Sequence, residues 1–263
     1  MKLLTIGNSF SDDSMEYVYS IAQSAGVGTI CLGNLYIGGC TLNTHADNAE
    51  NDRAAYAYRI NDHGHWCSTD NYKMRDAIRS ENWDCISLQQ ASGSSGIEQT
   101  YAKLPYMIEY VHRLCPGAKI VWNMTWAYQQ DSSHEEFAKY NRDQMTMYTA
   151  ILNAVEKQVR PRQDISAIIP TGTAIQNART SCIGDRLTRD GYNLSLDFGR
   201  YVAGLTFVRK LTGLSIEHVA FAPEGVGEPM RRIAVESAVN AVQTPDRVTP
   251  SRYTADPAAC TGR

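Results

Sequence analysis

The amino-acid sequence predicts an α/β fold in which a parallel sheet of five strands is covered by helices on both faces. Short apolar runs alternate along the chain with longer segments of helical pattern, as consecutive strand–helix–strand units require. The runs end at glycine, proline, asparagine or serine residues, which favour turns. The chain has 263 residues, a length that fits one large domain. We expect this domain to span 1–245 and to be followed by a polar tail at 246–263.

Five apolar runs have the length and composition of buried strands, at 3–6, 29–36, 83–88, 118–126 and 164–169. Helical patterns follow them, at 15–25, 72–80, 100–115, 134–160, 171–179, 197–211 and 230–242. The polar segment 42–60 is rich in alanine and tyrosine and is predicted to be partly helical, and 61–71 is predicted to be a loop.

Ser9 stands at the junction between the first predicted strand and the first predicted helix. Gly7 and Asn8 end the apolar run, and acidic residues that can cap a helix follow at Asp12 and Asp13. A serine in this position is exposed and rigidly held, and its backbone N–H lies at a helix N-terminus, where negative charge is favoured. These are the requirements of a nucleophile beside an oxyanion hole. The alternative is an ordinary turn made by small residues.

Other polar segments follow the remaining predicted strands. They are Gly38-Gly39, Gln89-Gln90 and the loop that begins at Asp190. In a parallel sheet ligands bind at the carboxyl ends of the strands, so we expect these segments to converge with Ser9 on one edge. Trp126 follows the fourth predicted strand and is predicted to line a sugar site, although an aromatic core is an equally good interpretation.

Composition argues against several classes of partner. The formal net charge of −3 gives no preference for nucleic acid or an anionic membrane surface. No apolar run has the length of a membrane span or the form of a signal peptide. We expect a cytoplasmic protein, or the mature form of a secreted one, that acts on a small molecule or glycan. Gly38-Gly39 lacks the dinucleotide fingerprint, and His63 and His65 have no second cluster of ligands, so no cofactor or metal is predicted.

Several motifs together resemble the SGNH (GDSL-like) hydrolase superfamily. The segment Gly7-Asn8-Ser9-Phe10-Ser11 is similar to its first block, with asparagine where aspartate is usual, and Gly39 is similar to its second-block glycine. Residues 189–195 resemble its fifth block, Asp-x-x-His. Gln89-Gln90 stands where its third block would fall, but does not match it. The combination is most similar to a gut-bacterial branch associated with carbohydrates, and it spans roughly residues 1–212.

This resemblance implies a three-layer α/β/α sandwich of flavodoxin-like topology and a serine esterase that removes acetyl or another small acyl group from a carbohydrate. Ser9 would attack the acyl carbon, and Asp190 would orient the base three residues further on. The oxyanion would be held by the N–H groups of Ser9 and Gly39 and by a side-chain amide of Gln89 or Gln90, of which Gln90 is the preferred donor. The predicted substrate-binding residues are Asn8, Gly38, Gln89 and Trp126.

Position 193 departs from the superfamily pattern, because the expected histidine is an asparagine. An amide cannot accept the serine proton near neutral pH. We expect Asn193 to point its amide toward Ser9, leaving Asp190 without the imidazole N–H that it would accept. The favoured explanation is a replacement in an otherwise intact site. The alternatives are that another histidine, such as His45 or His63, is the base, or that the chain is a catalytically silent carbohydrate-binding protein.

Overall fold

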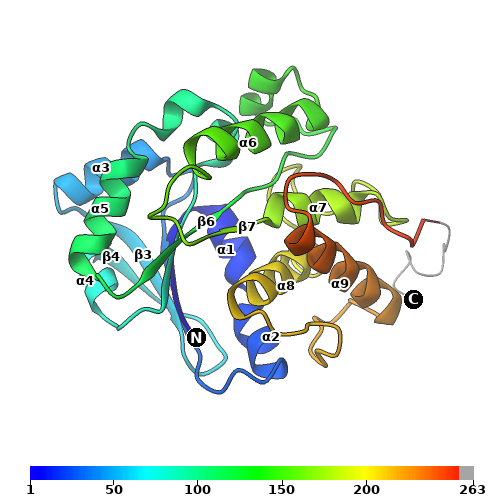
Figure 1. Cartoon of the computed structure of the whole chain (residues 1–263), viewed down its shortest axis with the longest axis horizontal. Coiled ribbons are helices and arrows are strands. Elements are labelled where there is room, and N and C mark those ends of the chain that lie inside the picture. The colour runs from blue at the N-terminus through cyan, green and yellow to red at the C-terminus, as the bar shows by residue number, and fades with distance from the viewer. Residues whose placement is uncertain (255–263) are drawn as a thin grey trace.

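The computed structural model describes residues 1–254, which form one sheet with helices on both faces (Figure 1). The strands, in the spatial order β4-β3-β2-β1-β5-β6-β7, are β1 (Lys2–Gly7), β2 (Cys31–Tyr36), β3 (Ala54–Asn61), β4 (Cys67–Lys73), β5 (Cys85–Leu88), β6 (Lys119–Asn123) and β7 (Ala167–Ile169). The α-helices are α1 (Ser9–Met15), α2 (Val18–Ser24), α3 (Leu42–Glu50), α4 (Met74–Arg79), α5 (Leu104–Leu114), α6 (Gln144–Gln158), α7 (Thr171–Arg179), α8 (Phe198–Thr212) and α9 (Glu228–Gln243). Short 3-10 helices are η1 (Ser92–Ser94), η2 (Glu98–Tyr101) and η3 (Glu135–Tyr140).

The sheet has seven strands and is mixed, so the prediction of five parallel strands is wrong in number and direction. Strands β1, β2, β5, β6 and β7 pair in parallel, as predicted for the apolar runs. Strands β3 and β4 form an antiparallel hairpin on the edge of β2. The chain leaves β1 for β2 on one side and returns to β5 on the other, which places the topological switch point next to β1.

The hairpin was predicted as helix and loop because its pattern is weak. In β3, Tyr56 and Tyr58 are buried at alternate positions, which is strand periodicity hidden among alanines. Strand β4 is mostly exposed and polar, as is common for an edge strand, and so gives no apolar signal.

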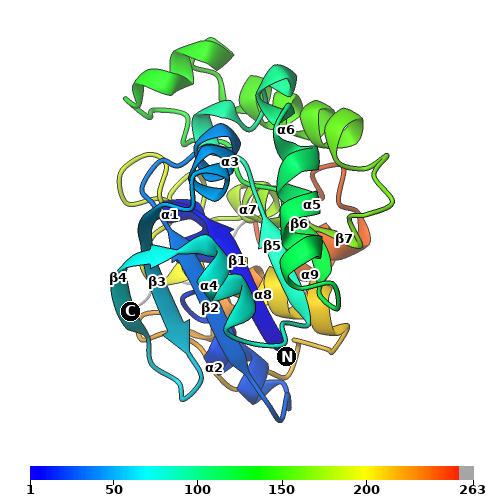
Figure 2. The same cartoon turned by 90° about the vertical axis from the view of Figure 1, so that its left-hand side faces the viewer.

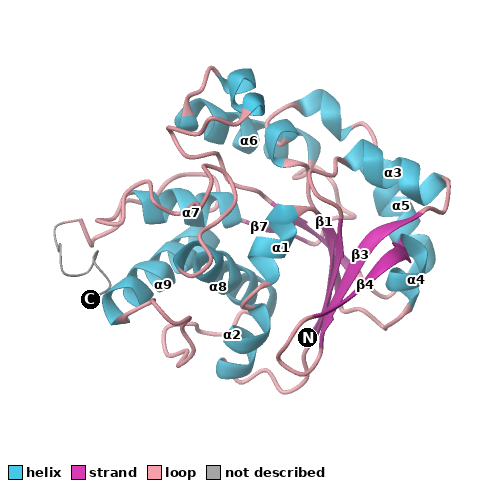
Figure 3. Ribbon diagram, turned by 180° about the vertical axis from the view of Figure 1, so that it is seen from behind, coloured by secondary structure: helices cyan, strands magenta, loops and turns pink. Residues whose placement is uncertain are grey.

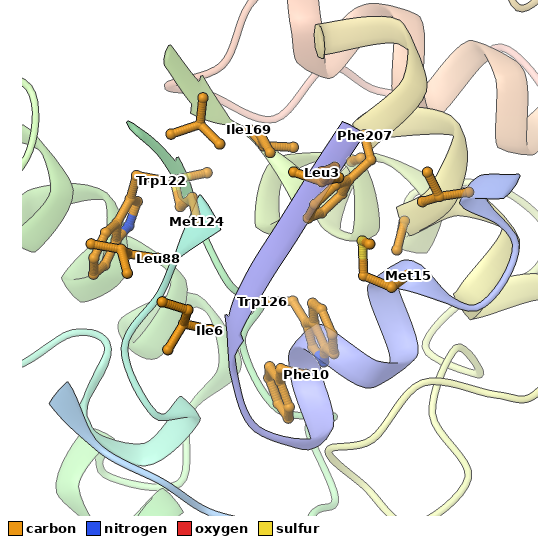
Figure 4. Packing of buried hydrophobic residues seen from close by; sticks show 14 of the residues in the cluster. Leu3, Ile6, Phe10, Met15, Leu88, Trp122, Met124, Trp126, Ile169 and Phe207 are labelled. Carbon is orange, nitrogen blue, oxygen red and sulfur yellow. The ribbon is translucent and has the colours of Figure 1, made fainter. Parts of the chain in front are cut away.

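Two layers of helices enclose the sheet. Helices α1, α2, α7, α8 and α9 lie on one face, and α3, α4 and α5 lie on the other (Figure 3). In the close-up view Ile6, Leu88 and Trp122 point to one side, and this follows from their register as neighbours on β1, β5 and β6 (Figure 4). Leu3 points to the other side, toward Phe207 of α8. All five side chains are almost completely buried.

The helix predicted over 134–160 is interrupted. η3 ends at Tyr140, and Asn141 and Arg142 then take positive φ angles of 57° and 52°. Asp143 caps the following helix α6, since its side chain accepts a hydrogen bond from the Thr146 N–H at 2.7 Å. Asp143 therefore begins a new helix within what the sequence predicts as one continuous helix.

The predicted polar tail at 246–263 is described only as far as 254, and residues 255–263 lie outside the described part of the chain. The segment up to 254 packs on the domain: the Thr249 N–H donates to Asn177 Oδ1 at 2.7 Å, and the Ser251 N–H donates to Thr180 Oγ1 at 2.8 Å. Among residues 1–254, no helix has both the length and the apolar character needed to cross a membrane.

Asp13 joins α1 to α8 and to the loop before α8. Its carboxylate is fully buried and accepts hydrogen bonds from Arg189 Nη1 at 2.9 Å, Arg200 Nε at 2.8 Å and the Leu194 N–H at 2.8 Å. Burial raises the pKa of the Asp13 carboxyl, and the charges of Arg200 and Arg189 partly oppose that shift. The cluster is thus a desolvated ion network whose members depend on one another.

Replacing Asp13 with asparagine should lower the free energy of unfolding by about 3 kcal/mol, because it removes the anion from a buried pair and leaves two guanidinium groups without it. Urea unfolding followed by circular dichroism measures this change. The neighbouring Asp12→Asn is the matched control, since Asp12 is partly exposed and pairs with Arg59 near the surface, where a loss of about 1 kcal/mol or less is expected. Equal losses in the two variants would contradict the role given to Asp13.

Candidate functional site

Ser9 is the first residue of α1 and lies directly beyond the carboxyl end of β1. Asn8 caps the helix, because its Oδ1 accepts a hydrogen bond from the Phe10 N–H at 3.0 Å. The Ser9 side chain is half-buried, and its backbone N–H belongs to the first helical turn, where no helical carbonyl is in reach. Gly7 is required here, since a Cβ atom at this position would lie 2.7 Å from Ser11 Oγ.

The Gly38-Gly39 turn lies beside Asn8. The Ile37 N–H donates to the Gly7 carbonyl at 3.3 Å, and Asn8 Nδ2 donates to the Cys40 carbonyl at 3.0 Å. Gly39 has a positive φ of 64°, which only glycine adopts without strain, and both glycines are exposed. The turn that carries the predicted second N–H donor is therefore bonded to the residue that precedes Ser9.

The two glutamines after β5 point to different places. Gln89 Nε2 donates to Asn8 Oδ1 at 3.0 Å, which puts its amide against the residue before Ser9. Gln90 Nε2 instead donates to the carbonyl and hydroxyl of Thr100, at 2.8 and 3.1 Å. The Gln90 amide is thus directed to Thr100, which does not favour it as the oxyanion donor, whereas the Gln89 amide lies beside the residue that precedes Ser9.

Asp190 and Asn193 form a direct pair within a tight loop. Asp190 Oδ1 accepts the backbone N–H groups of Tyr192 and Asn193, at 3.1 and 2.7 Å, and its Oδ2 accepts Asn193 Nδ2 at 2.7 Å. Gly191 has a φ of 90°, and a Cβ atom on it would lie 2.8 Å from Ser132 Oγ. The loop is therefore fixed both internally and by its neighbour.

The Asp190 loop is held against the start of α1. The Leu194 N–H is bonded to Asp13, and Trp126 Nε1 donates to the Tyr192 carbonyl at 2.8 Å. The Trp126 ring stacks on Phe10, with ring centroids 4.0 Å apart and planes 4° from parallel. Because Phe10 follows Ser9 in the chain, these contacts bring the loop to the segment that bears the serine.

The amide of Asn193 does not point as predicted. Its Nδ2 donates to Asp190, so Asp190 has an N–H partner after all. Its Oδ1 is buried and has no hydrogen-bond partner within the described residues. No hydrogen bond joins Asn193 to Ser9 in the part of the chain that the structure describes.

Neither of the histidines proposed as alternative bases contacts Ser9. His45 is completely buried, burial lowers its pKa to about 3, and its Nδ1 lies 2.9 Å from the Tyr56 hydroxyl. His63 is exposed in the turn between β3 and β4. Because Asn61 of β3 pairs with Leu32 of β2, that turn lies at the amino ends of the parallel strands, opposite Ser9 (Figure 2).

A different histidine lies near the Asp190 loop. The His134 ring packs edge-on against Tyr192 at 4.6 Å between centroids, and Tyr128 completes the group. His134 Nδ1 accepts the Glu136 N–H at 3.2 Å. No sequence signal indicates this proximity, because His134 lies far from the Asp190 loop in the chain.

Three of the four predicted substrate-binding residues are almost completely buried. Trp126 is 0% exposed and forms part of the core, with its ring stacked on Phe10 and its indole N–H bonded to the Tyr192 carbonyl. Asn8 is 2% exposed, and its side chain is occupied by capping and by Gln89. Gly38 is exposed at the site, while Gln89 is almost completely buried.

Comparisons with known proteins identify a matching family and two similar structures. The family model of a domain of unknown function, DUF4886, matches residues 2–241. A DUF4886 family protein from Bacteroides uniformis is 40% identical, with 97% of this chain and 99% of that one covered and a TM-score of 0.93. A candidate SGNH hydrolase from Slackia heliotrinireducens is 17% identical, with 80% and 97% covered and a TM-score of 0.50. No curated protein is significantly similar in sequence.

The match to the Slackia protein shows that the chain has the fold of an SGNH hydrolase, which confirms the resemblance at the level of the fold. The family model covers most of the chain, and the Bacteroides structure covers nearly all of it. The chain therefore belongs to the DUF4886 family.

Proposed function

We propose that this protein is a serine hydrolase of the SGNH type that cleaves small acyl esters, with activity limited by Asn193. The observation that carries the proposal is the Asp190–Asn193 pair. Its 2.7 Å bond reproduces the contact by which an aspartate orients a catalytic histidine, in a loop bonded to the helix that bears Ser9.

Ser9 would attack the acyl carbon of the ester. Negative charge would then develop on the carbonyl oxygen, and preorganised N–H groups stabilise such charge strongly. The backbone N–H groups of Ser9 and Gly39 and the side-chain amide of Gln89 are the donors that the geometry supports. We assign Gln89 rather than Gln90 because the Gln90 amide donates to the carbonyl and hydroxyl of Thr100 instead.

Asn193 can make the hydrogen bond to Asp190 that a catalytic histidine would make, but it cannot act as a base. Its amide keeps the Asp190 loop closed, but it cannot take the Ser9 proton or return it to the leaving alcohol. Loss of the triad base leaves only the contribution of the oxyanion hole and of substrate binding. We therefore expect slow turnover of activated esters by the native chain.

A carbohydrate acetyl ester is the substrate class we favour. The support is the resemblance to a branch associated with carbohydrates, together with the partly exposed rings of His134 and Tyr192 at the Asp190 loop. Aromatic rings with polar edges suit sugar rings, which present both C–H faces and hydroxyl groups.

Replacing Ser9 with alanine should abolish the hydrolysis of p-nitrophenyl acetate above the rate without enzyme, because the nucleophile is lost. Release of p-nitrophenol measures the rate, and Ser20→Ala on α2 is the matched control that should retain activity. Equal rates in native protein and Ser9→Ala would show that Ser9 is not the nucleophile.

Replacing Asn193 with histidine should raise kcat/KM for an aryl acetate by roughly two to four orders of magnitude, the contribution of a general base. KM should change little, because the base acts mainly in the transition state. Activity should rise with pH around an apparent pKa of about 6.5, because only the neutral imidazole accepts the proton.

Two variants control this experiment. Asn193→Gln keeps an amide at the position and should give no gain, and Ser9→Ala combined with Asn193→His should be inactive. A folded Asn193→His protein with no gain on any aryl ester would argue against the proposed base position.

A silent carbohydrate-binding protein is the second candidate, and Asn193 is the observation that favours it. An intact Asp190 loop without a base is what a scaffold retained for binding alone would have. This alternative predicts saturable binding of a glycan that survives Ser9→Ala, with no turnover of any ester. Calorimetric titration of the native protein and Ser9→Ala with acetylated and free oligosaccharides distinguishes the two, since Ser9-dependent turnover excludes the silent form.

A further inference from the structure

A chain of buried polar side chains crosses the carboxyl edge of the sheet. It runs from Asn8 after β1 to Gln89 after β5, Asn123 at the end of β6 and Thr171 at the start of α7. These side chains are between 0% and 3% exposed. Burying a polar group without a hydrogen-bond partner costs free energy. The members of this connected set must therefore find their partners inside the protein.

Each member donates one hydrogen bond to the next. The Thr171 hydroxyl donates to Asn123 Oδ1 at 2.7 Å, and Asn123 Nδ2 donates to Gln89 Oε1 at 3.0 Å. Gln89 Nε2 donates to Asn8 Oδ1 at 3.0 Å, and Asn8 Nδ2 ends the chain on the Cys40 carbonyl at 3.0 Å. We call this set, from Thr171 to Asn8, the amide relay.

The direction of the amide relay is fixed at the Asn8 end. The Phe10 N–H can only donate, so the Asn8 atom that it meets must be the oxygen. The Cys40 carbonyl can only accept, so the atom that it meets must be the nitrogen. Gln89 must then present its nitrogen to Asn8 and its oxygen to Asn123, and the amide orientations follow from the network.

The opposite end is held by Thr171. Gly172, the next residue, donates its N–H to the Met124 carbonyl at 2.8 Å, and a Cβ atom on it would lie 2.2 Å from the Thr125 carbonyl oxygen. The start of α7 is thus packed directly on the segment that follows β6. This contact keeps the Thr171 hydroxyl aimed at Asn123.

We propose that Asn123 and Thr171 are positioning residues that orient the Gln89 amide as a donor of the oxyanion hole. The inference rests on the proposed function. Gln89 Nε2 has two hydrogens, and within residues 1–254 it donates only to Asn8, so in this proposal the second hydrogen meets the developing negative charge. Without the relay, rotation of the terminal amide would bring Oε1 toward that charge and repel it.

The test compares Thr171→Val, which removes the hydroxyl and keeps the shape, with Thr171→Ser, which keeps the hydroxyl. Both are made in the Asn193→His protein and assayed on an aryl acetate. Thr171→Val should lower kcat by about tenfold, a fraction of what loss of a whole oxyanion donor costs, with KM changed less than about twofold. Thr171→Ser should restore kcat to within about threefold.

Thr173→Val is the matched control. Thr173 lies on the same helix, is equally buried and donates its hydroxyl to the Pro245 carbonyl, outside the amide relay. It should leave kcat unchanged within about twofold, so a drop as large as that of Thr171→Val would overturn the inference. Thr171→Ala repeats the test if the valine variant does not fold.

The side-chain amide signals of Gln89 in nitrogen-15 NMR spectra give a second readout that needs no turnover. In the native chain, Thr171→Val should shift these signals and speed their hydrogen exchange by about tenfold, and Thr173→Val should not.

Unchanged signals, or an active Asn193→His enzyme whose kcat is insensitive to Thr171→Val, would overturn the inference and leave the esterase proposal standing. Absence of Ser9-dependent turnover in every variant would instead defeat the proposed function, and the role in the oxyanion hole with it.

Discussion

The carboxamide of Asn8 is the contact on which the carboxyl edge of the sheet depends. Its oxygen accepts from the first turn of α1 and from Gln89, and its nitrogen holds the Cys40 carbonyl. One buried side chain thus joins the ends of β1, β2 and β5 around Ser9. An aspartate at this position could accept the same two bonds but could not donate to Cys40, which gives a physical reason for the departure from the usual first block.

The other side of Ser9 is fixed by a charge instead of an amide. Asp13 lies one helical turn beyond the serine and binds the backbone of Leu194, next to Asn193. Arg189 and Arg200 share the same carboxylate, so the loop and α8 are anchored at a single buried point. The short helix α1 therefore carries Ser9, the proposed nucleophile, and is also bonded through Asp13 to the segment that follows Asn193.

Local features made the segments around Ser9 and Asp190 predictable, because each lies at a strand end or in a turn with a distinct pattern. Partners far apart in sequence were not predictable: Leu194 and Asp13 are separated by 181 residues. The sequence could not separate Gln89 from Gln90 either, since successive residues of an extended chain point in opposite directions and their amides bond to Asn8 and to Thr100 respectively. The hairpin of β3 and β4 was missed because its apolar alternation is short and its edge strand is exposed.

If the proposed function holds, an asparagine at position 193 separates the two tasks of a catalytic base. An imidazole in this loop would donate one N–H to Asp190 and offer its other nitrogen to the serine. Asn193 performs the first task with its amide nitrogen and so preserves the loop. Its Oδ1 is buried without a hydrogen-bond partner among residues 1–254, and an amide oxygen is not a base near neutral pH. The loop therefore closes with asparagine at this position, while the proposed proton transfer would be lost. The closed loop is therefore evidence for the architecture of this site alone, and the proposed chemistry depends on which atom residue 193 presents to Ser9.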